Sequence, residues 1–166
     1  MSLQRAWQHL TMSPWKVRRH FPPATLAAIE AAVKACESRH AGEIRFAVEG
    51  GLPLARVWAG LTPRDRAAEV FAQLRVWDTE HNNGVLIYVL LADRDVEIVA
   101  DRGVGERRVP PAEWQACCRL IEAEFGAGRY AEGAAAGIEA VAAVLGRYPP
   151  DRPDFGNELP DTPVLL

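Results

Sequence analysis

Residues 81–103 read "HNNGVLIYVLLADRDVEIVADRG", and this stretch decides the fold. The run from Gly84 to Ala92 carries no charge and is almost entirely apolar, which is typical of a strand covered on both faces of a sheet. A short polar turn follows at residues 93–95, and "VEIVA" at 96–100 then alternates apolar and polar residues. Two strands joined by a short turn predict an antiparallel hairpin whose first strand lies at the centre of the sheet.

Apolar residues recur at helical spacing on both sides of this hairpin. Helices are predicted over residues 22–40, 61–77, 110–125 and 130–148, and the second has Thr62 as its N-cap followed by Pro63. Residues 42–51, "GEIRFAVEGG", alternate in polarity and predict a half-buried strand. The resulting order is helix, strand, helix, hairpin, helix, helix, which predicts an α/β domain with a small mixed sheet covered by helices.

The two ends of the chain differ from this middle part, which we take as one domain over residues 22–148. Residues 1–21 are rich in Trp and Arg, and Leu3, Trp7 and Leu10 fit one face of a short helix. We expect this segment to dock on the domain, and a membrane-surface anchor is the alternative interpretation. Residues 149–166 hold five of the 12 prolines and show no periodicity, so we expect an extended, largely disordered tail.

Composition excludes several classes of protein. A net charge of −3 without a basic block gives no attraction to nucleic acid, and no apolar run is long enough to span a bilayer. The N-terminus lacks the apolar segment of a signal peptide, and three cysteines do not make a disulfide framework, so we expect a cytoplasmic protein. The chain also lacks a G-x-S-x-G elbow and a P-loop lysine, which excludes the common serine hydrolases and P-loop enzymes.

Carboxylates near the ends of the predicted hairpin strands are the remaining candidates for chemistry. Asp78 precedes the central strand, Asp93 and Asp95 follow it, and Asp101 follows the second strand. Oxygen ligands of this kind suit hard cations such as Ca²⁺, Mg²⁺ or Mn²⁺. Solvated turns also use Asp frequently, so the residues alone leave both interpretations open.

The segment "NNGVLIYVLLADRDVEIVADRGV" resembles the signature of the TPM domain family, in which an Asn-Gly pair precedes a hydrophobic strand and an Asp-Arg turn follows it. Asn83, Gly84, Asp93, Arg94 and Gly103 carry this resemblance. The segment "EFGAGRYAEGAAAGIEAVAAVL" is similar to the closing pattern of the family, and the resemblance covers roughly residues 22 to 147. It implies a three-layer α/β/α sandwich whose acidic cluster binds divalent cations, and some members are proposed acid phosphatases.

Two departures from the family pattern bear on the expected site. Where many members have an acidic element before the first helix, this chain has "RRHFPPATL", and "ADRG" after the second strand adds the carboxylate of Asp101. This chain also lacks the signal peptide and the C-terminal membrane helix that most familiar members carry, so it looks like a bacterial variant without them.

Two hypotheses about function follow. The preferred one is a non-catalytic module that binds a divalent cation through Asp93, Asp95 and either Asp78 or Asp101, and binds an unidentified protein partner in a quality-control role. The alternative is a metal-dependent acid phosphatase acting on phosphomonoesters, in which Asp93, Arg94 and His81 are the catalytic candidates and His81 would serve as the general base. The first is preferred because no residue pair is poised as nucleophile and base.

Overall fold

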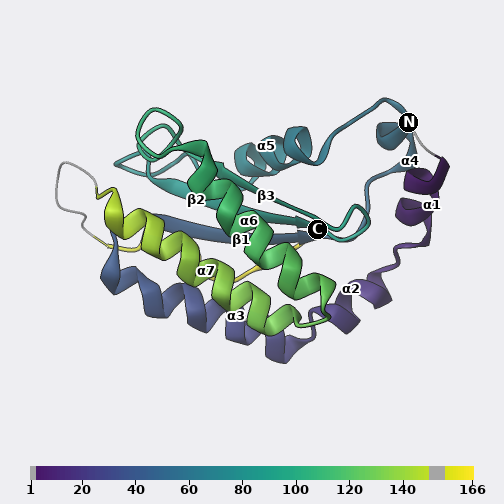
Figure 1. Cartoon of the computed structure of the whole chain (residues 1–166), viewed down its shortest axis with the longest axis horizontal. Helices are drawn as coiled ribbons and strands as arrows, with labels where there is room; N and C mark the ends of the chain where they lie inside the picture. Colours follow the sequence, from purple (N-terminus) through teal and green to yellow (C-terminus); the bar gives the residue numbers. More distant parts are fainter. Residues whose placement is uncertain (1–2, 150–155) are drawn as a thin grey trace.

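The computed structural model describes residues 3–149 and 156–166. In chain order its elements are α1 (Leu3–Thr11), α2 (Pro14–His20), α3 (Pro23–Cys36), a 3-10 turn (Glu37–Arg39), β1 (Glu43–Glu49), α4 (Leu54–Trp58), α5 (Pro63–Gln73), β2 (Gly84–Leu90), β3 (Asp95–Ala100), α6 (Pro111–Gly126), α7 (Tyr130–Arg147) and β4 (Val164–Leu165). Figure 1 shows them as one sheet with helices on both sides. No helix in the described ranges is long and apolar enough to cross a membrane.

The sheet has four strands in the order β3-β2-β1-β4. Strand β2 pairs in parallel with β1, from Gly84 opposite Glu43 to Leu90 opposite Glu49. On its other side it pairs antiparallel with β3, so that Leu90 faces Asp95. The predicted hairpin is therefore confirmed, and β2 has a neighbour on each side.

The two faces of β2 belong to two separate hydrophobic cores. Val85, Ile87 and Val89 pack in one core with residues of α3, α6 and α7. Leu86, Tyr88 and Leu90 pack in the other with residues of α4 and α5. All seven residues of β2 are buried. Helices cover both faces of the sheet, as Figure 1 shows, which confirms the predicted three-layer α/β/α arrangement.

Strand β1 is buried along its whole length, whereas its alternating sequence predicted a half-buried strand. The C-terminal residues 156–166 cover it, because β4 pairs in parallel with β1 and the Leu159 side chain is buried. The Leu159 N–H donates to Glu43 Oε2 at 3.1 Å, and Arg45 donates to the carbonyl of Thr162 at 3.2 Å. Glu43 and Arg45 of β1 are thus buried with partners that lie more than a hundred positions away in the sequence.

This packing corrects the prediction of a disordered tail for the part of it that is described. Residues 156–166 are extended, as their proline content suggests, but they are held against the edge of the sheet by backbone and side-chain hydrogen bonds. Residues 150–155, which the prediction also included, lie outside the described residues.

The start of β2 requires a glycine for a steric reason. A Cβ atom on Gly84 would lie 1.9 Å from the backbone oxygen of Val76, which no side chain can tolerate. The φ angle of Gly84 is not among the positive ones, so close approach of the chain explains this glycine better than an unusual backbone conformation.

We therefore expect Gly84→Ala to lower the free energy of unfolding by about 1–3 kcal/mol or more, because the backbone must move to accommodate one methyl group. Gly126→Ala is the control, since a Cβ at that helical position meets nothing within 4 Å. It should leave stability unchanged or raise it by up to about 1 kcal/mol. Urea denaturation of both variants measures the difference, and equal stabilities would show that β2 has room at Gly84.

Candidate functional site

The carboxylate of Asp93, at the turn between β2 and β3, is bound by the N-terminal helix. Arg5 Nε lies 3.0 Å from Asp93 Oδ1, and Arg5 Nη2 lies 2.9 Å from Oδ2. His9 Nε2 lies 3.1 Å from the same Oδ1. Because His9 Nδ1 accepts a hydrogen bond from the Leu52 N–H at 2.9 Å, the ring proton resides on Nε2, which donates to Asp93.

These contacts determine the ionisation of Asp93. Burial by itself raises the pKa of a carboxyl group, but the hydrogen bonds from Arg5 and His9 outweigh burial and hold the pKa of Asp93 below its ordinary value. The Arg5 and Asp93 side chains are only 22% and 11% exposed. Asp93 is therefore an anion whose two oxygens are already engaged by α1.

A cleft of about 600 Å³ opens beside the same turn, at the carboxyl end of β2. We call it the hairpin cleft. Its lining comes from α1–α2, the hairpin and the α6–α7 connection: Met12, Lys16, His20, Val89, Leu90, Leu91, Arg94, Asp95, Val96, Glu122, Phe125, Gly126, Gly128 and Tyr130. Open α/β sheets commonly bind ligands outside the carboxyl ends of their strands, which is the position of this cleft.

Asp95 is the unusual residue in the hairpin cleft. Its Oδ1 atom is buried and has no hydrogen-bond partner among the described residues. Burial, followed by the negative charges of Glu97, Glu122 and Asp93, raises the pKa of Asp95 to about 6. A cation placed beside Oδ1 would satisfy this oxygen and relieve the repulsion between the carboxylates.

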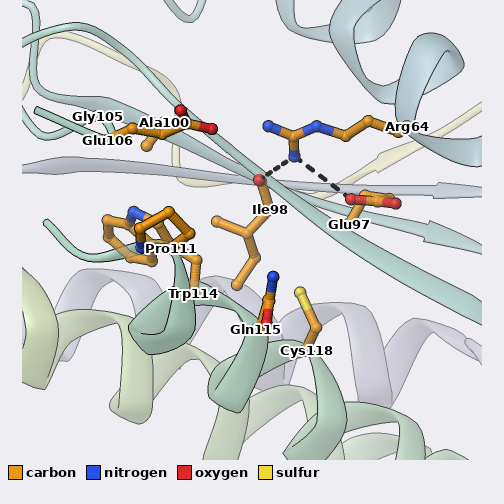
Figure 2. A pocket seen from close by; sticks show the side chains of 10 residues that line it. All are labelled: Arg64, Glu97, Ile98, Ala100, Gly105, Glu106, Pro111, Trp114, Gln115 and Cys118. Atoms are coloured by element: carbon orange, nitrogen blue, oxygen red, sulfur yellow. Dashed lines mark hydrogen bonds and ion pairs between the residues drawn. The ribbon is translucent and has the colours of Figure 1, made fainter.

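A second cleft, of about 440 Å³, runs along the outer side of β3 and is called the edge cleft (Figure 2). Figure 2 shows Arg64 reaching from α5 to the carbonyl oxygen of Ile98 and to Glu97, while Trp114, Gln115 and Cys118 rise from α6 on the opposite side. Its other lining residues are Ala100, Gly105, Glu106 and Pro111.

Side chains already satisfy part of the open edge of β3, both at the edge cleft and beside the hairpin cleft. Arg64 donates to the Ile98 carbonyl, and Glu122 Oε1 accepts from the Val96 N–H at 3.1 Å. Capping by charged side chains is a common way to prevent an edge strand from pairing with another chain. Burial raises the pKa of Cys118 to about 12, so its thiol is not a nucleophile at neutral pH.

A buried polar cluster closes the carboxyl end of β1. Glu49 accepts hydrogen bonds from the Tyr88 hydroxyl at 2.6 Å and from Arg66 Nε at 2.8 Å. Burial and the adjacent Glu49 raise the pKa of Tyr88, so the phenol keeps its proton and donates. These groups satisfy one another and join β1, β2 and α5, which makes the cluster a structural link between layers.

The four aspartates predicted as metal ligands lie at two different ends of the sheet. Asp93 and Asp95 flank the hairpin turn, whereas the Asp101 N–H binds the carbonyl of Gly84 at the start of β2. Asp78 lies in the loop before β2 and pairs with Arg75. Strand β2 has seven residues, so its ends are about 20 Å apart at roughly 3.3 Å per residue. One ion can therefore contact either Asp93 and Asp95 or residues at the other end of β2, such as Asp78 and Asp101, but not both sets.

His81 also lies before β2, and thus far from Asp93 and Arg94. Asp101 resembles Asp95 in having one buried oxygen, Oδ2, without a partner in the described ranges, but it lines neither cleft. Across residues 3–149 and 156–166, no three His, Cys, Asp or Glu side chains form a group that could hold a metal ion.

Sequence reasoning missed Arg5, His9 and Glu122 as parts of this region. Arg5 and His9 stand four positions apart on the face of α1 opposite to Leu3, Trp7 and Leu10, and this spacing is the signal that could have identified them. Glu122 sits in the middle of α6 among ordinary helix residues, and nothing in the sequence distinguishes it.

Known proteins share this fold. The model of the TPM domain matches residues 19–144, and the chain belongs to the TPM domain family. The solution structure of the BA42 protein from the psychrophilic bacterium Bizionia argentinensis is similar, with 31% identity, a TM-score of 0.74, and coverage of 86% of this chain and 93% of that one. The comparison with curated proteins gave no match.

A second solved structure, the N-terminal domain of a protein from P. gingivalis, supports the fold alone. It shares 24% identity, with a TM-score of 0.57 and coverage of 80% of this chain and 82% of that chain.

The Arg5–Asp93 interaction should be energetically significant, which a double-mutant cycle with Arg5→Ala and Asp93→Ala tests. We expect a coupling energy above about 1 kcal/mol, because hydrogen bonds to charged groups are worth about 1.5–3 kcal/mol when shielded from solvent. Arg75 and Asp78 provide the matched control, since their side chains are 66% and 51% exposed. Their coupling should stay below about 1 kcal/mol. Equal couplings for the two pairs would contradict a specific role for Asp93 in holding α1.

Proposed function

We propose that this chain is a non-catalytic binding module whose hairpin cleft holds a divalent cation through Asp95. The observation that carries the proposal is the buried Asp95 Oδ1, which has no partner in the described structure, while the charges of Glu97, Glu122 and Asp93 act against its ionisation. An unpaired buried oxygen is costly, and a hard cation such as Ca²⁺, Mg²⁺ or Mn²⁺ removes that cost.

The neighbouring residues define how such an ion would be held. Glu122 lines the same cleft, and its Oε1 already accepts from the Val96 N–H, which orients the carboxylate. Asp93 is engaged by Arg5 and His9, so it joins the ion only if α1 releases it. With few protein ligands, waters or a bound ligand complete the coordination, as is usual for Mg²⁺.

Hydrolysis of phosphomonoesters is the second candidate, because Lys16 and Arg94 line the hairpin cleft together with Asp95. Two cationic side chains beside a metal ligand are suited to a phosphate group. The sequence-based general base, His81, lies at the opposite end of β2, so the geometry favours binding over catalysis. A quality-control role, a protein partner and a cytoplasmic location stay predictions.

The pH dependence of Asp95→Asn tests the state of this carboxyl group. Because its pKa is raised to about 6 in the folded protein, ionisation opposes folding, and this penalty appears as the pH rises from the ordinary value of 3.8 through 6. The variant should therefore be more stable than the wild type at pH 7.5 and equally stable at pH 4. Thermal unfolding measures both, with Asp78→Asn as an exposed control.

The same assay tests the cation. For the chelator-stripped wild type at pH 7.5, an ion at a hundredfold excess over its dissociation constant raises stability by about 2.7 kcal/mol. Asp95→Asn should abolish the increase, whereas Asp78→Asn should retain it. If Ca²⁺, Mg²⁺ and Mn²⁺ all leave the wild type unchanged, the cation proposal fails even where the pH dependence of Asp95 is confirmed. A phosphatase assay with p-nitrophenyl phosphate, with and without the ion, separates binding from hydrolysis.

A further inference from the structure

Helix α1 presents its large apolar side chains to solvent and two of its polar side chains, Arg5 and His9, to the protein. Leu3, Trp7 and Leu10 are 79%, 65% and 60% exposed, whereas His9 is buried and Arg5 binds Asp93. A surface helix ordinarily turns its apolar stripe toward the core. Rotation of α1 to bury the stripe would break the contacts of both Arg5 and His9, so these contacts fix the apolar stripe outward.

Helices α2 and α4 add exposed aromatic residues at the same end of the molecule, which Figure 1 shows beyond the hairpin turn. Trp15 of α2 is 65% exposed, and the Arg19 guanidinium lies 5.5 Å from the centre of its ring. Trp58 of α4 is 56% exposed, and α4 packs against α1. Tryptophans with a basic neighbour are typical of side chains that reside at a membrane interface.

The N-terminal segment that forms this face carries only positive charge. Residues 1–29 contain Arg5, Lys16, Arg18 and Arg19 and no Asp or Glu, although the whole chain has a net charge of −3. Arg5 is neutralised by Asp93, whereas Arg18 and Arg19 are exposed. A second copy of the chain would bring like charges together, and an acidic surface would attract them.

We propose that this N-terminal face, formed by Leu3, Trp7, Leu10, Trp15, Arg18 and Arg19, binds the surface of an anionic lipid bilayer. The apolar stripe of α1 enters the boundary between headgroups and acyl chains, Trp15 lies at headgroup level, and the arginines contact anionic headgroups. In this arrangement the described residues lie on the bilayer, and none of their helices crosses it. This proposal depends on Asp93 only because Asp93 holds α1 in place, and it stands whether or not a cation binds at Asp95.

Sedimentation with vesicles tests the proposal. One set contains equal amounts of phosphatidylglycerol and phosphatidylcholine, and the other contains phosphatidylcholine alone. We expect binding to the first set, weaker binding at high salt because surface charges are screened, and little binding to the second. The Trp7 side chain is exposed, so Trp7→Ser should fold normally, which an unchanged melting temperature verifies.

Trp7→Ser should reduce the partition coefficient about tenfold or more, because burial of a large aromatic side chain in lipid is lost. Trp77→Ser is the matched control, since Trp77 is 47% exposed but lies in the loop before β2, at the other end of the sheet. It should bind like the wild type, and the double variant Arg18→Glu, Arg19→Glu should lose the dependence on anionic lipid.

Three results would overturn the proposal. They are the absence of binding to the anionic vesicles at low salt, equal binding by Trp7→Ser and Trp77→Ser, and a dimer in sedimentation equilibrium that Trp7→Ser dissociates while vesicles bind nothing. The last result would identify the N-terminal face as a contact between copies of the chain. Specific binding of a protein partner through this face without vesicle binding would likewise replace the lipid.

Discussion

The carboxylate of Asp93 accepts hydrogen bonds from Arg5 and His9 of α1, a helix that begins 90 residues earlier in the sequence. This contact connects the N-terminal helix to the central hairpin of the sheet. It fixes the rotation of α1 about its own axis, and thereby decides which side chains face solvent. It also engages a carboxylate at the carboxyl end of the central strands, where a ligand would otherwise be expected. The neighbouring Asp95 is left with a buried oxygen and a raised pKa.

The two carboxylates at this turn have opposite properties because their surroundings differ. Both are partly buried, which alone would raise the pKa of each. Asp93 has a guanidinium and an imidazole N–H as partners, whereas Asp95 is close to other carboxylates. Asp93 therefore has a structural role, and Asp95 is the group whose charge needs an additional partner. Exchange between Arg5 and a cation at Asp93 would couple ion binding to the docking of α1.

The sequence predicted those parts of the fold that depend on local patterns. The central hairpin, the Thr62 cap and the main helices follow from periodicity and turn residues. Strand β4 and the burial of Glu43 and Arg45 did not, because they depend on a tail that returns to the sheet from over a hundred positions away. Tertiary contacts of this kind leave no periodic signal in either segment.

In the candidate site, too, the sequence predicted the residues that lie beside a local motif but not their distant partners. Asp93 and Asp95 were found because they flank a recognisable turn. The separation of Asp78 and Asp101 from them follows from the direction of β2, since residues before a strand and residues after it lie at opposite ends. The pairing of Asp93 with Arg5 could not be found, because the two residues lie 88 positions apart in the sequence.

Hydrogen exchange of the α1 amides in Asp93→Asn tests the role of Asp93 most directly. Asparagine retains the shape of the side chain but removes the charge that Arg5 requires. We expect the amides of α1 to lose protection at pH 7 while those of β2 keep theirs, because α1 then opens locally without unfolding the sheet. Unchanged protection of α1 in this variant would contradict the conclusion that Asp93 holds the N-terminal helix and sets its outward-facing side.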